Sequence, residues 1–368
     1  MTSRLSSFGS IALSLFVAAG CNKAADSGAD DLPDAMEATS DAPVPVAAPQ
    51  VLVPKALGRV VDFAYSDDWV YPIVNLGGSF KLVACPRATG CGAAPNVIGR
   101  ASTAARGQGV EVAGNKIYWV VDDTTLAQAT LDGSTVGERH HFFGAGKIVP
   151  HLRGTAGALY LDYNSFDAPA HTVTLSFDTA TTAPPKEIAG TKTSDVSFAT
   201  SVDAGAGVLA VWRQAASGAR PIQIIDVASG PVGTGGASSE ISLGGLAVGS
   251  TRLFYVDGDT SSNLSEFPLY ACPLTGTCTS PARIATASRR TIAAHGDRVY
   301  FAGRDPASNR STILSCDLAA STSCMPKAIV MPETDFDFLN VLALRADASA
   351  VWVATDVGGE GTLWRIPL

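Results

Sequence analysis

The sequence predicts an all-β fold, a β-propeller of seven four-stranded blades, with six or eight blades as the alternatives. Three observations predict it. A pattern of short strands and turns recurs about every 47 residues between residues 50 and 368. Each copy contains four short apolar runs, which is the strand content of a propeller blade. Three copies also carry a pair of cysteines at the same place in the pattern.

The composition fits this fold. The chain has 368 residues, enough for two average domains or one large all-β domain. Its hydrophobic content of 46% supplies a buried core, and its 36 glycines and 21 prolines suit many short strands joined by tight turns.

An aromatic residue in the second strand of each unit sets the period. It can be followed as Tyr71, Tyr118, Tyr160, Phe254, Tyr300 and Trp352, and the long gap after Tyr160 holds one more unit, with Trp212 in its second strand. The cysteine pairs give the same spacing, because Cys272 and Cys316 lie one step apart. Two independent markers therefore agree.

The last unit lacks an outer strand. Its three strands end at Leu368, whereas residues 51–57 resemble the fourth strands of the other units and precede the first complete unit. We expect this N-terminal strand to complete the last blade and close the ring, which would remove an open sheet edge.

Residues 1–20 read as a lipoprotein signal peptide. The apolar run from Ile11 to Ala19 is too short to span a membrane, and small residues precede Cys21. This pattern resembles the bacterial lipobox, which implies cleavage before Cys21 and lipid attachment to it. The alternative is a plain secretory peptide with an unmodified cysteine. Asn22 is not an aspartate retention signal, which favours the outer membrane, on its periplasmic or surface side.

Residues 21–49 read as a disordered acidic tether rich in Ala, Asp and Pro, and residues 50–368 as the propeller. The tether carries much of the formal charge of −8. The remaining domain is weakly acidic and lacks the basic surface that phosphate binding requires, so we expect no nucleic-acid partner.

The other six cysteines form three local pairs. They are Cys85 with Cys91, Cys272 with Cys278, and Cys316 with Cys324. Such pairs indicate disulfides outside the cytoplasm, each between the third and fourth strands of a blade. Zinc binding and redox chemistry are the alternatives, but the spacing does not match a zinc knuckle and no histidine is adjacent.

Strands such as residues 117–120 and 253–257 are similar to the Tyr-Trp-Thr-Asp repeats of extracellular propellers, in a degenerate form. Together with the Cys-Pro…Gly-Cys hairpins, they make residues 50–368 resemble uncharacterised bacterial lipoprotein propellers. The resemblance implies the architecture and no particular activity.

Four polar residues suggest a site in the central channel. Aligning the first strands of the units places Asp62, Glu111, His151 and Ser197 at equivalent positions in the first four blades, and Leu246, Ile292 and Leu342 in the later ones. Carboxylates and an imidazole in one channel could bind a divalent cation or act as general acid and base. Alternatively, they simply line a water-filled channel.

No Gly-x-Ser-x-Gly, phosphate-loop, dinucleotide or His-Glu-x-x-His motif occurs, so the sequence assigns no catalytic residue and no cofactor. The leading hypothesis is a non-catalytic, lipid-anchored propeller that binds a protein or glycan partner at the cell envelope. Its binding face would be formed by the loops after the second strands, such as residues 164–170 and 304–310. The alternatives are a metal-dependent, lactonase-like hydrolase that uses the channel residues, and a scaffold subunit of an envelope assembly.

Overall fold

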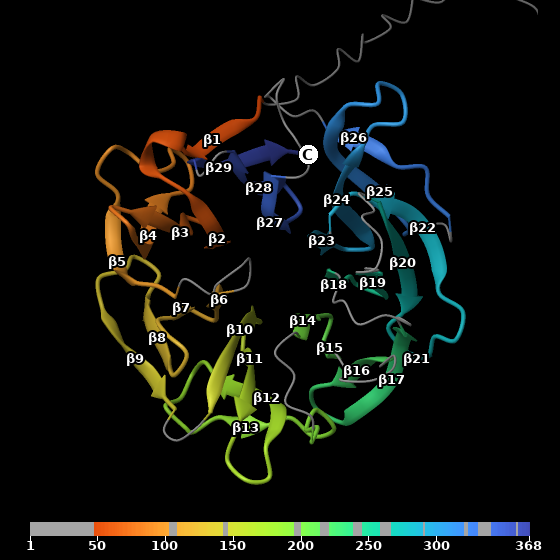
Figure 1. The fold of residues 1–368 in the computed structure, drawn as a ribbon, viewed down its shortest axis with the longest axis horizontal. Helices are drawn as coiled ribbons and strands as arrows, with labels where there is room; N and C mark the ends of the chain where they lie inside the picture. The colour runs from red at the N-terminus through yellow and green to blue at the C-terminus, as the bar shows by residue number, and fades with distance from the viewer. Residues whose placement is uncertain are drawn as a thin grey trace, which may run out of the picture. The chain divides into compact units, whose positions relative to one another are not determined.

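The computed structural model describes residues 48–102, 109–142, 146–194, 200–213, 221–237, 245–257, 266–289, 291–319, 323–329, 340–357 and 360–368. Its strands form seven sheets arranged as a ring around a central channel (Figure 1). The seven-bladed propeller predicted from the repeat is confirmed. Cys21 lies outside the described residues, as does Ser197.

Each blade is an antiparallel meander whose first strand lies innermost. Blade 1 contains β2 (Val60–Tyr65), β3 (Trp69–Leu76), β4 (Ser79–Pro86) and β5 (Asn96–Arg100). Blade 2 contains β6 (Val110–Ala113), β7 (Lys116–Val120), β8 (Thr125–Thr130) and β9 (Val136–His141). Blade 3 contains β10 (Lys147–Gly154), β11 (Ala158–Ser165), β12 (His171–Asp178) and β13 (Lys186–Glu187).

The remaining blades follow the same order around the ring. Blade 4 contains β14 (Thr200–Gly205), β15 (Val208–Arg213), β16 (Pro221–Asp226) and β17 (Gly230–Ala237). Blade 5 contains β18 (Leu246–Val248), β19 (Arg252–Val256), β20 (Phe267–Pro273) and β22 (Ala282–Ala287), and its short β21 (Gly276–Thr277) pairs with blade 4. Blade 6 contains β23 (Ile292–His295), β24 (Arg298–Arg304), β25 (Ser311–Asp317) and β26 (Lys327–Ile329).

Blade 7 combines the two ends of the domain. Its strands are β27 (Val341–Ala346), β28 (Ala350–Val357) and β29 (Glu360–Pro367), and its outer strand is β1 (Gln50–Val53), which precedes the 3-10 turn η1 (Lys55–Leu57). β1 pairs with β29 antiparallel, with Gln50 opposite Arg365 (Figure 1). The predicted closure of the ring by an N-terminal strand is therefore confirmed.

Side chains strengthen this closure between blades 1 and 7. Arg87 of blade 1 lies 2.8 Å from the Asp347 carboxylate of blade 7, and its guanidinium carbon lies 4.7 Å from the Trp352 ring centroid. Tyr65 stacks on the same indole with ring centroids 4.7 Å apart. Ion pairing, cation–π contact and stacking thus join the first and last blades.

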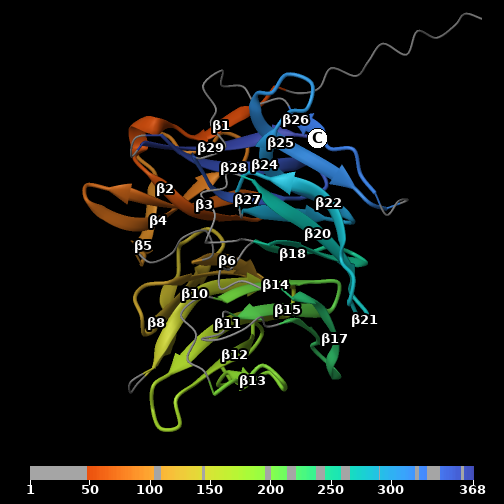
Figure 2. The same ribbon diagram turned by 45° about the vertical axis from the view of Figure 1, so that its right-hand side comes forward.

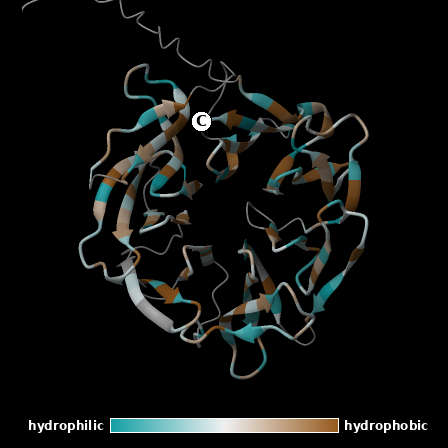
Figure 3. Cartoon of the chain, turned by 180° about the vertical axis from the view of Figure 1, so that it is seen from behind, coloured by the Kyte–Doolittle hydropathy of each residue, from teal (hydrophilic) through white to brown (hydrophobic). Residues whose placement is uncertain are grey.

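The core lies between neighbouring blades. Its apolar clusters combine residues of adjacent sheets, and hydrophobic segments occur along the strands of every blade (Figure 3). The aromatic residues that set the repeat are buried, among them Tyr71, Tyr118 and Trp352. The sequence period therefore reports the packing of one blade against the next.

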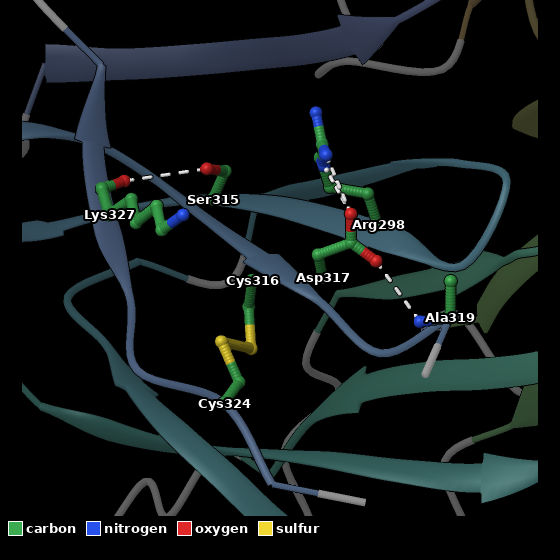
Figure 4. Close-up of a disulfide and its surroundings, with 7 residues drawn as sticks. All are labelled: Arg298, Ser315, Cys316, Asp317, Ala319, Cys324 and Lys327. Carbon is green, nitrogen blue, oxygen red and sulfur yellow. Dashed lines mark hydrogen bonds and ion pairs between the residues drawn. A yellow bond between two sulfur atoms is a disulfide. The ribbon is translucent and has the colours of Figure 1, made fainter. Parts of the chain in front are cut away.

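All three predicted disulfides are present: Cys85–Cys91, Cys272–Cys278 and Cys316–Cys324 (Figure 4). Each joins the third strand of a blade to the turn that leads to the fourth. Around the third disulfide, Asp317 accepts from Arg298 at 2.6 Å and from the Ala319 N–H at 3.0 Å (Figure 4).

Two of the disulfide turns also hold the preceding blade. The Cys91 N–H donates to the Leu52 carbonyl of β1 at 2.7 Å, and the Cys278 N–H donates to the Thr234 carbonyl of β17 at 2.8 Å. β21 lies beside β17 as a parallel strand (Figure 2). In both cases the turn satisfies an outer edge that would otherwise remain open. We call these two turns the edge clamps.

The close approach between each edge clamp and the neighbouring outer strand requires a glycine. Gly90, in the first edge clamp, has a φ of 74° and lies against the Leu52 backbone, where a Cβ would overlap the Leu52 carbonyl. In the second clamp, a Cβ on Gly233 would overlap the Gly276 carbonyl. The glycine content predicted tight turns, and some of the glycines also allow close contacts between blades.

Among the described residues, no helix is long and apolar enough to cross a membrane.

Candidate functional site: the central channel

Seven positions on the innermost strands are structurally equivalent. In every blade, one first-strand residue pairs with the second-strand residue seven positions later. The seven positions are Ala64, Glu111, Arg153, Asp203, Ala247, Ala293 and Arg345. Four of them carry charge, and the charges alternate in sign around the ring.

These four residues form a chain of ion pairs, which we call the charge belt. Arg345 of blade 7 reaches past Ala64 of blade 1 to Glu111 of blade 2, with Nη1 2.7 Å from Oε2. Arg153 of blade 3 lies 3.6 Å from the same carboxylate, and its Nε lies 2.6 Å from Asp203 Oδ1 of blade 4. Ala64, at the equivalent position of blade 1, carries no charge, so the ion pair joins blades 7 and 2 directly.

Arg345 is the residue that binds most partners. Its Nη2 donates to the Val110 carbonyl at 3.0 Å and lies 3.9 Å from Asp62 Oδ1. Burial acts to lower the pKa of the guanidinium, but the Glu111 and Asp62 carboxylates outweigh it and raise the pKa. Arg345 therefore stays charged at any physiological pH.

Asp62 lies beside the charge belt and is completely buried. Its Oδ2 accepts from the N–H groups of Gly109 at 2.6 Å and Val110 at 3.1 Å, which join blade 1 to the first strand of blade 2. Burial raises the pKa of Asp62 to about 6, although Arg345 partly opposes the shift. Asp62 is thus a connection between blades rather than a solvent-facing carboxylate.

Asp203 makes the corresponding connection between blades 4 and 5. Its Oδ2 accepts from the Val248 N–H at 2.6 Å, while Oδ1 binds Arg153. Burial raises its pKa, and the arginine and the N–H donor partly offset this effect. Asp62 and Asp203 therefore each join their own blade to the next one.

The charge belt lines a cavity of about 320 Å³. Glu111, Arg153, Asp203 and Arg345 form one side of it, and the opposite side is formed by apolar residues of blades 5, 6 and 7, namely Leu246, Ala247, Ile292, Ala293, Ala294 and Leu344. The division into a charged and an apolar half agrees with the sequence expectation. Most of the charged residues in this cavity, however, are not the ones that the sequence alignment had selected.

Of the three aligned residues that the structure describes, Asp62, Glu111 and His151, only Glu111 lines this cavity. Asp62 lies two positions before the residue equivalent to Glu111, and His151 lies two positions before Arg153. The first strands were thus aligned out of register, although each equivalent residue pairs with a second-strand residue seven positions later, on the turn side of the β-bulges in blades 1, 3 and 7. The expected equivalence of Asp62, Glu111 and His151 was therefore wrong.

His151 sits in the bulge of β10. Its Nδ1 is buried and has no hydrogen-bond partner within the described part of the chain. Burial lowers its pKa to about 4, against the influence of nearby Asp162. The imidazole is therefore neutral at pH 7.

The residues missed by the alignment are Arg153, Asp203 and Arg345. A better signal was available in the sequence, because counting seven residues back from Tyr118, Tyr160 and Trp352 leads directly to Glu111, Arg153 and Arg345. In blade 4 the equivalent residue pairs with Ala210, two positions before Trp212, so this rule would have missed Asp203.

The positive and negative charges of the belt neutralise one another. Each lining carboxylate has an arginine partner, and the two arginines balance the two carboxylates. Across the described ranges, no group of three or more His, Cys, Asp or Glu side chains is placed to hold a metal ion. A general base would have to be released from an ion pair before it could accept a proton.

The cavity lies towards the turns that join first to second strands. Its lining residues, such as Gly154, Ala294 and Ala346, precede those turns directly. In an antiparallel meander these turns share a face with the disulfide turns. Two further hollows lie on the same face, one of about 590 Å³ that includes Trp69 and Asn115, and one of about 420 Å³ that includes Arg298 and Asp347. This face is opposite to the loops that the sequence favoured.

No protein-family model matches the sequence, and no curated protein matches it significantly. The fold is similar to that of solved propellers. For an oligogalacturonate lyase in complex with manganese the TM-score is 0.57, with 10% identity over 87% of this chain and 93% of that chain. For an oligogalacturonate lyase from Vibrio parahaemolyticus the values are 0.56, 9%, 87% and 93%.

The β-propeller domain of the Trilobed protease from Pyrococcus furiosus is also similar, with a TM-score of 0.51 and 10% identity over 84% of this chain and 95% of that domain. That domain has an open velcro topology, whereas β1 and β29 close the ring here. At such identities the similarity shows the fold alone.

Proposed function

We propose that this protein is a non-catalytic binding protein of the bacterial cell envelope. In this proposal, lipid on Cys21 attaches it to the outer membrane, residues 22–49 form a tether, and the propeller binds a protein or glycan partner. The observation that carries the non-catalytic part is the neutralised charge belt, in which Glu111, Asp203 and their arginines bind each other.

The face that holds the channel mouth is the better candidate for partner binding. Hollows beside Trp69 and Arg298 add shape to it, and aromatic and arginine side chains are enriched at protein–protein interfaces. The loop at residues 304–310, on the opposite face, is an exposed turn in which Asp305 accepts from the Ala307 and Ser308 N–H groups. Its polar groups satisfy each other.

The experiment compares the full-length wild-type chain with Cys21→Ser. We expect the wild type to fractionate with the outer membrane and to carry a lipid on its N-terminal cysteine by mass spectrometry, and we expect the variant to lose both. Cross-linking in intact cells followed by affinity purification should then recover a defined partner. A stoichiometric complex of several proteins would indicate the scaffold role instead.

A hydrolase would behave differently. If the purified protein hydrolysed a lactone or an ester, and if Glu111→Gln removed the activity while Asp67→Asn at an exposed turn kept it, the non-catalytic proposal would be overturned. Bound divalent metal at one equivalent in the active protein would identify the metal-dependent alternative.

A further inference from the structure

The charge belt does not close around the channel. It begins at Arg345, continues through Glu111 and Arg153, and ends at Asp203. Between Asp203 in blade 4 and Arg345 in blade 7, the equivalent positions of blades 5 and 6 are Ala247 and Ala293. The belt therefore has an open gap with a carboxylate at one end and a guanidinium at the other.

Both ends retain hydrogen-bonding capacity. A guanidinium has five N–H donors, and the contacts of Arg345 with Glu111, Val110 and Asp62 occupy at most three of them. A carboxylate can accept about four hydrogen bonds, whereas the Asp203 carboxylate accepts from Arg153 and from the Val248 and Ala204 N–H groups. Both residues line the cavity, so a molecule inside it can contact them.

The wall along the gap is apolar. Leu246, Ile292 and Leu344 line it, and the two alanines leave space beside them. A volume of about 320 Å³ lies at the small end of the range of ligand pockets. The gap thus offers a surface for an aliphatic group between two opposite charges.

We propose that the channel binds a short zwitterionic peptide with free termini, whose ammonium group contacts Asp203, whose carboxylate contacts Arg345, and whose aliphatic side chains pack on Leu246 and Ile292. A single arginine side chain crosses the gap at Ala64, but the gap at Ala247 and Ala293 spans two blades. A ligand with its charges at opposite ends suits this wider gap better than a single α-amino acid, in which the two charges are adjacent.

Charge balance favours the same class. The belt residues that line the cavity are two carboxylates and two guanidinium groups, so a ligand without net charge adds no uncompensated charge to the site. With the ligand in place, positive and negative groups would alternate around the whole ring. This site does not depend on the proposed envelope partner, and either proposal can fail without the other.

The test uses the dipeptide alanyl-leucine with the purified full-length protein in detergent. Isothermal titration calorimetry would compare it with its N-acetylated form, which lacks the ammonium group, and with its C-terminal amide, which lacks the carboxylate. Because each blocked form loses a charge-assisted hydrogen bond, we expect affinity to fall at least about tenfold for each. No binding at millimolar dipeptide, or equal binding of the blocked forms, would overturn the proposal.

A variant and a cross-link locate the site. Ala294→Phe places a large side chain in the cavity, and Ala328→Phe on exposed β26 of the same blade is the matched control. We expect loss of dipeptide binding only in the first. If Ala294→Phe does not fold, a diazirine analogue of alanyl-leucine on the wild type should label residues 246–248 or 292–294, and labelling confined to other segments would contradict the site.

Discussion

Asp62 both accepts hydrogen bonds from blade 2 and carries an ionisable proton, and substituting it by asparagine separates these two roles. The amide oxygen of asparagine can still accept from the Gly109 and Val110 N–H groups, which Oδ2 of Asp62 binds in the structure. What the substitution removes is the ionisable proton. The variant therefore keeps the connection between blades 1 and 2 and loses its pH dependence.

The sign of the effect follows from the pKa. Burial raises the pKa of Asp62 from 3.8 to about 6, so between pH 4 and pH 6 the folded protein binds this proton more tightly than the unfolded chain. The free energy of unfolding contributed by Asp62 is therefore fully present below pH 4 and falls as the pH rises through 6. A difference of about two pKa units corresponds to roughly 3 kcal/mol lost by pH 7.

Urea denaturation of wild type and Asp62→Asn, followed by tryptophan fluorescence at several pH values from 4 to 7, measures this quantity. We expect the variant to gain stability relative to wild type as the pH rises, by up to about 3 kcal/mol. Asp67→Asn at an exposed turn is the control for replacing an aspartate elsewhere. A stability difference that stays constant over this range, or that grows towards low pH, would refute the reasoning.

Three further predictions concern the closure of the ring. Replacing Cys85 and Cys91 together by serine should lower the free energy of unfolding by about 2 kcal/mol, because the loop closure is lost. Amide hydrogen exchange in β1 should become faster, because the first edge clamp loosens. Unchanged exchange in β1 would contradict the clamp. Arg87→Met should lower the free energy of unfolding, measured by heat or urea, by about 1–2 kcal/mol, since it removes the ion pair with Asp347 and the contact with Trp352. The control Arg283→Met, on an exposed outer strand, should lower it by less than about 0.5 kcal/mol. Deleting residues 48–53 exposes the edge of β29 and should produce concentration-dependent self-association in sedimentation experiments; a monomer as stable as wild type would show that β1 is dispensable.

The architecture could be predicted because its signals are periodic. Each buried second-strand aromatic, such as Tyr118 or Trp352, marks one blade, and each Cys-Pro turn marks the end of a third strand. The closing strand followed from the need to complete the last sheet. These features depend on local sequence and on the repetition of one unit.

The candidate site could be predicted only in outline. A polar and an apolar half of the channel were foreseen, but the first strands were aligned out of register, so Arg153, Asp203 and Arg345 were missed. The pairing of Arg345 with Glu111 joins residues more than two hundred positions apart, so no local pattern in the sequence reveals it. The edge clamps were likewise invisible, because their partners Leu52 and Thr234 belong to other blades.

The pairing of β1 with β29 also constrains how the chain acquires its fold during synthesis. β1 is among the first strands of the propeller to emerge from the ribosome, and its partner, with Arg365 opposite Gln50, is the last. At typical elongation rates of 5–20 residues per second, the interval is roughly 15–60 s. Throughout it, Leu52 and Val53, which are buried in the finished ring, have no sheet to join. Burial of these two side chains therefore has to wait until the final strand is in place.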